Sequence, residues 1–352
     1  MLEILQPGVG PHGDGPYLPA DPRHVFWGVL PCEADRPVLS IDPGDEVTID
    51  TLSHEGLLDD QGSDPAAFFA SHGVPREQVL DDAVALVATR QRGADDGPHV
   101  VTGPIEVRGA EPGELLAIDV LETIPRVPYG VISNRHGRGA LPGEFPRGET
   151  NVSVFAAARD GQGWVPRVAG GDADVHFPLD PFLGIMGVAV AGDTRPHSVP
   201  PGRHGGNIDV KLLTVGSTLY LPVQVAGALA FVGDPHFAQG DGEVALTAME
   251  ASLRVRLRFR RVHSDHPLAR VARRHGPIIE TPEFLVPTGM DADLGEANRS
   301  AVRAAIDLLG EVHGMDPEHA FAYLSAATDF NISQVVDRVT GVHARIRKAD
   351  FQ

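Results

Sequence analysis

Glycine and proline interrupt this chain along its whole length, and no other feature constrains its fold as strongly. The 352 residues include 40 glycines and 30 prolines, dispersed among apolar segments. Both residue types interrupt helices and are frequent in turns. We therefore expect a turn-rich, strand-rich chain, too long for one simple core. Because 42% of the residues are hydrophobic, we do not expect disorder.

Local patterns divide the chain into three predicted regions. Residues 1–125 show strand-like alternation, with turns at Asp42–Asp45 and at GAEPGE, and a partly helical insertion over 64–89. Residues 126–290 form a second β-rich region, which begins with an irregular glycine-rich stretch up to residue 150. Residues 291–352 change character: an apolar stripe predicts a helix that ends at Gly314, and Asp316-Pro317 opens another.

The predicted fold is therefore mostly β, a β-sandwich or barrel-like body with a C-terminal helical α+β part. We expect a third short helix to start at Asn331 or Ser333. The segment RVRLRFRR alternates arginine with apolar residues, which indicates a strand with one core face and one solvated or inter-subunit face.

Charge and cysteine content exclude several classes of protein. The net charge of −19 argues against general binding to nucleic acid or to an anionic membrane, because both need a basic surface. The single cysteine, Cys32, permits no intramolecular disulfide bond. The chain shows neither an N-terminal leader pattern nor an apolar run of ~18 residues, so we expect a cytoplasmic protein.

Two glycine-rich segments concentrate the polar side chains that could carry chemistry. The segment FVGDPHFAQGDGEV contains His236, Asp241 and Glu243, and RHGGNIDVK contains His204 and Asp209. His236 with Asp241 or Glu243, together with His204 or Asp209, gives the mixed nitrogen and oxygen ligands that a zinc or similar divalent ion accepts. The alternative is a plain hairpin, because Asp-Gly is a common turn pair.

Other residues are candidates for contact with a substrate. His54 and Glu55 follow a predicted strand, and His136 lies in the irregular stretch. Asn207, with the amides of Gly205 and Gly206, could polarise a carbonyl group. Cys32 has no base near it in the sequence, and the chain has no GxSxG motif, so water activated by a metal or by a carboxylate is the expected nucleophile.

The chain resembles the acetamidase/formamidase family. The resemblance rests on GGNID, GSTLYLPV, GALAFVGDPHFAQGDGEV and QVVDRVTGVHARIRK, with VVTGPIEVRGAEPGELL and PLDPFLGIMGVA upstream. It implies hydrolysis of a small linear amide to a carboxylate and ammonia, a divalent metal (zinc, with calcium as the alternative) and a homo-oligomer. The matching site positions are Asp209, His236, Asp241 and Glu243. HEGLLDDQ and YGVISNRHGRGALPGEF depart from the family pattern, so the substrate is the least constrained part of this prediction.

Three functions stay open from the sequence: cleavage of a linear amide, cleavage of a cyclic amide, and non-catalytic binding of a small ligand by a β-sandwich. We predict that Asp209 and His236 share one site. We also predict that the helices after residue 291 supply no ligand, and that Asp241 and Glu243 point to the same side of an extended segment. One of these two carboxylates would then act as the base.

Overall fold

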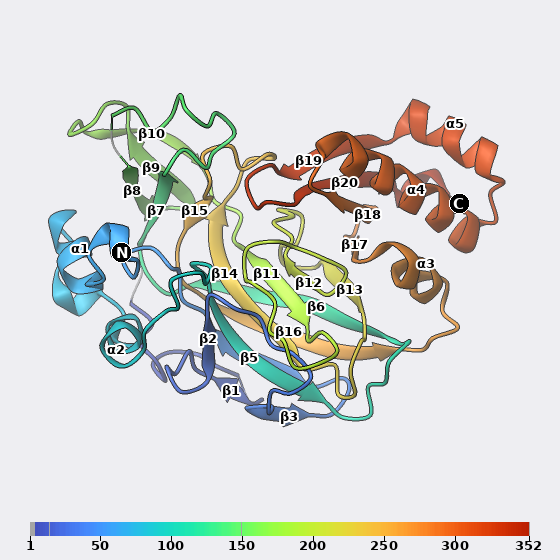
Figure 1. The fold of residues 1–352 in the computed structure, drawn as a ribbon, viewed down its shortest axis with the longest axis horizontal. Coiled ribbons are helices and arrows are strands. Elements are labelled where there is room, and N and C mark those ends of the chain that lie inside the picture. The colour runs from blue at the N-terminus through green and yellow to red at the C-terminus, as the bar shows by residue number, and fades with distance from the viewer. Residues whose placement is uncertain (1–3, 14, 149, 352) are drawn as a thin grey trace.

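Two β-sheets form the body of the molecule (Figure 1). The computed structural model describes residues 4–13, 15–148 and 150–351. One sheet follows the order β1 (Tyr17–Leu18), β4 (Glu46–Asp50), β16 (Leu253–Val262), β6 (Leu115–Pro125), β13 (Thr218–Pro222), β17 (Ile278–Glu280), β18 (Phe284–Asp291), β20 (Thr340–Arg347) and β19 (Asp329–Gln334).

The second sheet carries most of the strands that surround the candidate site. Its order is β10 (Ala173–Pro178), β9 (Gln162–Pro166), β8 (Asn151–Arg159), β7 (Tyr129–Arg135), β15 (Met249–Glu250), β14 (Ala230–Ala238), β11 (Phe182–Val188) and β12 (Gly205–Asn207). β5 (Val100–Val107) also pairs with β14, and it joins β2 (Val25–Trp27) and β3 (Leu39–Ile41) to this sheet. The predicted mostly β body is confirmed.

Helices cover both ends of this body (Figure 1). α1 (Pro65–Ser71) and α2 (Asp81–Thr89) form the predicted insertion at one end. α3 (Pro267–His275), α4 (Leu294–His313) and α5 (Pro317–Ala327) lie at the other end, with β17 to β20. Short 3₁₀ turns cover 59–61, 76–78 and 348–350. No helix in the described ranges is long and apolar enough to span a bilayer.

Local signals predict several element boundaries correctly. The two predicted turns connect β3 to β4 and β5 to β6. The side chain of Asp293 caps α4, and Gly314 ends it with a φ of 66°. The prediction of a third C-terminal helix is wrong, because residues 329–334 form β19 and pair with β20. The prediction that residues 126–150 are irregular is also partly wrong, since β7 occupies residues 129–135.

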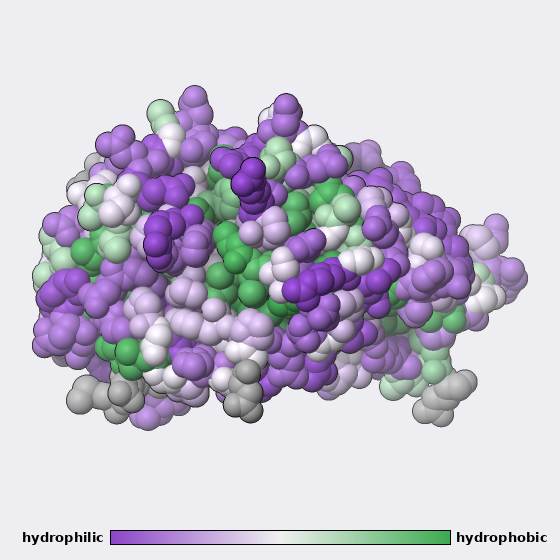
Figure 2. All heavy atoms as spheres, turned by 90° about the horizontal axis from the view of Figure 1, so that it is seen from below, coloured by the Kyte–Doolittle hydropathy of each residue, from purple (hydrophilic) through white to green (hydrophobic). Residues whose placement is uncertain are grey.

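β16 is the strand with alternating arginines. Val255, Leu257 and Phe259 are buried, while the arginines between them pair with acidic residues on neighbouring strands. Arg256 Nη1 lies 2.6 Å from Glu46, and Arg260 Nη2 lies 2.7 Å from Asp119. These pairs leave the arginine face partly exposed and nearly balanced in charge. Figure 2 shows that hydrophilic residues cover most of one face of the molecule, with smaller hydrophobic patches between them.

Buried ion pairs attach the N-terminal segment and α2 to the sheets. Arg126 is fully buried; it lies 2.8 Å from Asp82 on α2 and donates to the carbonyl of Leu5. Arg254 contacts Asp50 at 2.7 Å and donates to the carbonyl of Val9. All three predicted regions contribute strands to the nine-stranded sheet, and the boundaries at 125 and 290 stay predictions.

Candidate active site

His236 lies at the centre of a buried group of histidines and carboxylates. Its side chain on β14 is fully buried. Its Nε2 atom lies 3.1 Å from an oxygen of Asp234 and 3.0 Å from an oxygen of Glu250. Its Nδ1 atom lies 3.9 Å from Oδ1 of Asp209. Asp209 and His236 therefore lie within one group, as the sequence analysis predicts.

His54 and His99 lie on the other side of Asp234. His54 follows β4, and His99 directly precedes β5, which pairs with β14. His54 Nδ1 and His99 Nε2 are 3.6 Å and 3.8 Å from the same oxygen, Oδ1 of Asp234. Asp234 thus faces the two histidines with one oxygen and His236 with the other.

Two loops complete the group with carboxylates. The ligand atoms of Glu243, Asp209 and His236 lie within 4.8 Å of one another. Glu243 follows β14, and Asp337 lies between β19 and β20 with its carboxylate next to that of Asp209. Hydrogen bonds join the two loops, because the amide of Gly242 donates to the carbonyl of Ser333 at 3.0 Å and the carbonyl of Gly242 accepts from the amide of Val335 at 3.2 Å.

The C-terminal helices lie away from this group. The ring of His313 stacks on Phe351 at 4.0 Å, and His319 is 80% exposed beside Asp316. Among the residues described after 291, only the loop with Asp337 brings the C-terminal region into the group.

Three of the carboxylate residues have strained backbones. Asp209, Asp234 and Glu243 adopt φ values of 45°, 51° and 46°, in the left-handed region that residues with a side chain rarely adopt. Such strain costs on the order of 1–3 kcal/mol per residue, and it is concentrated at functional sites in proteins. The strain therefore favours a functional role for this group over a plain hairpin.

Gly184 on β11 lies against the same side chains. A methyl group at this position would lie 2.4 Å from Oδ1 of Asp209, 2.5 Å from Oδ2 of Asp234 and 2.7 Å from Cε1 of His236. These atoms therefore converge on one point above the strand, and only glycine leaves the space free.

The electrostatics of the group are dominated by burial and by crowded acids. Burial raises the pKa of Asp209 and of Glu243 well above the usual range, and neighbouring carboxylates raise both further. Burial opposes a charge on His236, but Glu250 and Asp234 outweigh it and raise the pKa of His236. Burial lowers the pKa of His99 to about 4, so this ring is neutral near pH 7. Such an acidic cluster is costly unless protons or a cation neutralise it.

The side chains fit a divalent cation. Several buried ring nitrogens and carboxylate oxygens have no hydrogen-bond partner among the described residues; they belong to His54, Asp209, Asp234, His236, Glu250 and Asp337. Buried polar atoms are nearly always partnered in proteins. Neutral imidazole with carboxylate oxygen is a ligand set that zinc accepts. The geometry gives three overlapping groups of possible ligands: His54, His99 and Asp234; Asp209, His236 and Glu243; and Asp234, His236 and Glu250.

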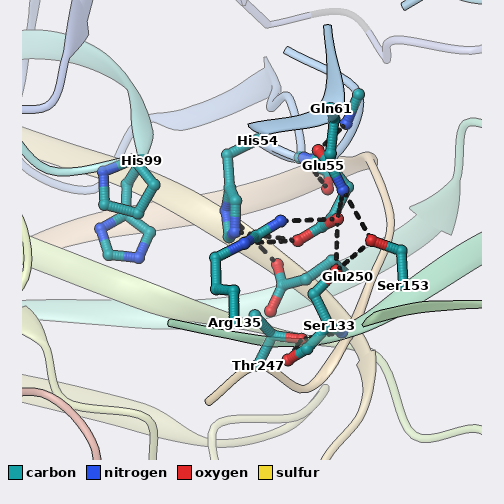
Figure 3. A network of polar contacts seen from close by, with 12 residues as sticks. His54, Glu55, Gln61, His99, Ser133, Arg135, Ser153, Thr247 and Glu250 are labelled. Carbon is teal, nitrogen blue, oxygen red and sulfur yellow. Dashed lines mark hydrogen bonds and ion pairs between the residues drawn. The ribbon is translucent and has the colours of Figure 1, made fainter. Parts of the chain in front are cut away.

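Glu55 lies next to His54 and accepts hydrogen bonds from several donors (Figure 3). One of its oxygens lies 3.4 Å from His54 Nε2 and 3.0 Å from Arg135 Nη1. The hydroxyl of Ser133 donates to the other oxygen at 2.7 Å. The side-chain amide of Gln61 donates to that same oxygen. Burial opposes ionisation, but Arg135 and His54 outweigh it and lower the pKa of Glu55 to about 2. Glu55 is therefore a fixed anion beside His54.

Four residues predicted for the site lie outside these groups. Asp241 accepts from Asn331 at 3.1 Å and lies 3.2 Å from Lys211. The prediction that Asp241 and Glu243 share a face is wrong, because β14 ends at Ala238 and the backbone then turns.

The other three have separate surroundings. His204 Nε2 is buried close to Gly206 and belongs to none of the ligand groups among the described residues. His136 pairs with Asp60 at 3.0 Å and is 37% exposed. Asn207 ends β12, with a buried Oδ1 that has no partner in the described part of the chain.

Four members of the group were missed in the sequence. Asp234 lies two residues before His236, a spacing that could have suggested it. Asp337 lies in QVVDRVTG, which stands out in the sequence only as a family motif. Glu250 and His99 lie at the ends of apolar stretches, which give no local signal.

Fold and site together define a β-rich protein with a buried histidine–carboxylate centre. The profile of the acetamidase/formamidase family matches residues 94–198 and 190–346. The chain belongs to this family.

Individual relatives agree with this assignment. The chain is 31% identical over 192 residues to a formamidase from Methylophilus methylotrophus. This match covers 42% of this chain and 47% of the relative. It is also 31% identical over 199 residues to an acetamidase from Mycolicibacterium smegmatis, and this match covers 42% of this chain and 49% of the relative. The chain thus spans about half the length of the relatives that it matches.

Solved structures share the fold. An acetamidase from Bacillus halodurans superposes with a TM-score of 0.74 at 24% identity, over 95% of this chain and 98% of that one. An acetamidase from Yersinia enterocolitica superposes with a TM-score of 0.75 at 23% identity, over 97% of this chain and 94% of that one. A gamma lactamase from Delftia acidovorans superposes with a TM-score of 0.55 at 21% identity, over 94% of this chain and 90% of that one.

Proposed function

We propose that this protein is an amidohydrolase that cleaves a small linear amide to a carboxylate and ammonia. The observation that carries the proposal is the buried group around His236, with its unpartnered nitrogens and oxygens, in a chain of the acetamidase/formamidase family. The names of the relatives, formamidase and acetamidase, support the substrate class.

The same group would hold a divalent cation, and we propose zinc. His236, Asp209 and Asp234 converge over Gly184, and His54 and His99 face the second oxygen of Asp234. A cation bound there supplies Lewis-acid chemistry: it polarises a carbonyl and makes water more acidic.

Glu243 is the proposed general base. Its side chain reaches Asp209 and His236, and at 7% exposure it is more accessible than Asp209 (1%) or Asp234 (3%). Burial and neighbouring carboxylates raise the pKa of Glu243, so it acts as a base only once a bound cation offsets those charges. In its ionised form the carboxylate would take a proton from the attacking water and return it to the leaving nitrogen, because ammonia leaves poorly without that proton. Asp241 is the less suitable base, since Lys211 and Asn331 occupy its carboxylate.

Asn207 is a proposed donor to the substrate carbonyl. It lies two residues before Asp209, and its side chain is buried. A donor held in a fixed position beside a carbonyl stabilises the negative charge that develops there.

Ammonia release tests the proposal. The zinc-loaded protein should release ammonia from formamide or acetamide, and His236→Ala purified in the same way should not. A γ-lactam belongs in the panel, because a cyclic amide is the alternative substrate and a neighbour in fold is named gamma lactamase. No release from any of these compounds would contradict the proposal and favour a binding protein. The proposed homo-oligomer is tested by light scattering.

A further inference from the structure

Gln239 follows the end of β14, and its side chain bonds two loops that carry carboxylates of the candidate site. The side-chain nitrogen Nε2 donates to the carbonyl of Asp209 at 2.9 Å and to the carbonyl of Ser333 at 3.2 Å. Both partners are carbonyl oxygens, so only the nitrogen end of the amide can face them. One NH₂ group therefore uses both of its hydrogens on two separate loops.

The bond to Asp209 secures a strained residue. Asp209 has a φ of 45°, and such a conformation persists only where the surrounding structure fixes it. The amide of Asp209 donates to the carbonyl of Gly184 at 3.3 Å. Its carbonyl has no donor other than Gln239 among the described residues. The peptide groups on either side of the Asp209 side chain are thus held separately, one by β11 and the other by Gln239.

The bond to Ser333 secures the loop of Asp337. Ser333 lies near the end of β19, four residues before Asp337. Its carbonyl accepts from the amide of Gly242 at 3.0 Å as well as from Gln239. Both hydrogen bonds join the β19–β20 loop to the segment that follows β14.

Three segments that are distant in sequence therefore meet at this side chain. Gln239 lies three residues after His236 and four before Glu243. Its two bonds add the turn of Asp209 and the loop of Asp337. Each of these segments supplies a side chain to the group around His236.

We propose that Gln239 is a positioning residue, whose amide fixes the carboxylate of Asp209 relative to His236. This inference rests on the proposed amide hydrolysis with zinc. The nitrogen of Gln239 bonds backbone carbonyls and no side chain of the group, so it acts through Asp209. Residues that orient ligands in this way typically change metal affinity or activity by ~10–100-fold when they are replaced.

Two substitutions test this role. Gln239→Met is similar in length and volume but has no hydrogen to donate. Gln239→Glu keeps the shape and places an oxygen against the two carbonyls. Both should lower kcat for the best amide substrate by roughly 10–100-fold at matched zinc content, with KM within about threefold of the parent, because misplaced groups act mainly on the transition state. Both should weaken zinc binding by a similar factor, measured by competition with a chromophoric chelator.

Gln6→Met is the matched control. Nε2 of Gln6 donates to the carbonyl of Val79 at 3.0 Å, and Oε1 accepts from the amide of Asp81 at 2.9 Å. This substitution also removes a glutamine with two bonds to the backbone, but these bonds reach the start of α2 and none of the proposed ligands. It should keep kcat and zinc affinity within about threefold of the parent. Thermal unfolding is measured for every variant, and the rates are taken well below the lowest Tm.

The inference is overturned if both Gln239 variants keep kcat and zinc affinity within about threefold of the parent, whatever their Tm. It is also overturned if Gln6→Met loses both to the same extent. A parent that binds zinc but releases ammonia from no amide overturns the proposed function, and zinc affinity then decides the role of Gln239 alone. A loss of about tenfold or more in Gln239→Met supports the role, and an unchanged affinity overturns it.

Discussion

Gly184 offers the sharpest test of the site, because its replacement by alanine changes one methyl group at the point where the proposed ligands converge. To reach 3.0 Å, below which real methyl carbons are essentially never found, Asp209 would have to retreat by 0.6 Å and Asp234 by 0.5 Å from their present distances of 2.4 Å and 2.5 Å. His236 would have to move by a smaller amount.

Displacements of this size are large for a reaction centre. Catalytic groups need placement to within ~0.5 Å, and a misplacement of ~1 Å can cost about 10²-fold in rate. We therefore expect Gly184→Ala to lower kcat/KM for the best amide substrate by roughly 10²-fold. It should also weaken zinc binding, since two of the proposed ligands move.

Gly187→Ala on the same strand is the matched control. Its methyl group would lie 2.4 Å from the ring of Phe231, so it disturbs packing to a similar degree, but its nearest neighbours include no side chain of the proposed ligands. Ammonia release, zinc titration and thermal unfolding are measured for both variants. The reasoning is refuted if Gly184→Ala keeps kcat/KM and zinc affinity within about threefold of the parent, or if Gly187→Ala loses both to the same extent.

Three further predictions follow from other parts of the structure. Glu243→Gln should lower kcat by ~10²–10⁴-fold at matched zinc content; ammonia release within about threefold of the parent would contradict its role as the base. Burial lowers the pKa of His204 to about 4, whereas a histidine in the unfolded chain has a pKa of ~6.5. As the pH falls below ~6.5, the unfolded chain binds a proton that the folded protein does not, and stability is lost. Between pH 7 and pH 5 the parent should lose about 2 kcal/mol more stability in urea unfolding than His204→Asn, and equal losses would contradict this. Arg126→Met leaves Asp82 without its buried cation and should cost roughly 3–5 kcal/mol in the same assay; a loss below about 1 kcal/mol would show that this ion pair matters little.

Much of the fold could be predicted because its signals are local. The caps of α4 at Asp293 and Gly314 and the alternation in β16 each depend on neighbouring residues in the chain. β19 could not be predicted in this way, because the strand state of residues 329–334 comes from pairing with β20. Pairing partners lie outside any local window, so propensity alone decides such segments poorly.

The site was predictable only in part for the same reason. Asp209, His236 and Glu243 lie in glycine-rich segments, whose composition marks them as candidates. His99 and Glu250 lie at the ends of apolar stretches, and only the pairing of β5 and β15 with β14 brings them to His236.

Glu243 shows why a local rule fails at this site. Side chains two residues apart share a face only where the backbone is extended. Gly242 and Glu243 have φ values of 100° and 46°, and the contacts of Gly242 with Ser333 and Val335 secure this turn. A C-terminal loop thus stabilises a backbone that the segment would not adopt alone, and it adds Asp337 to the group. Strain at a functional site is supported by structure elsewhere in the fold, so the departure of Glu243 from the local rule is itself an argument for its role.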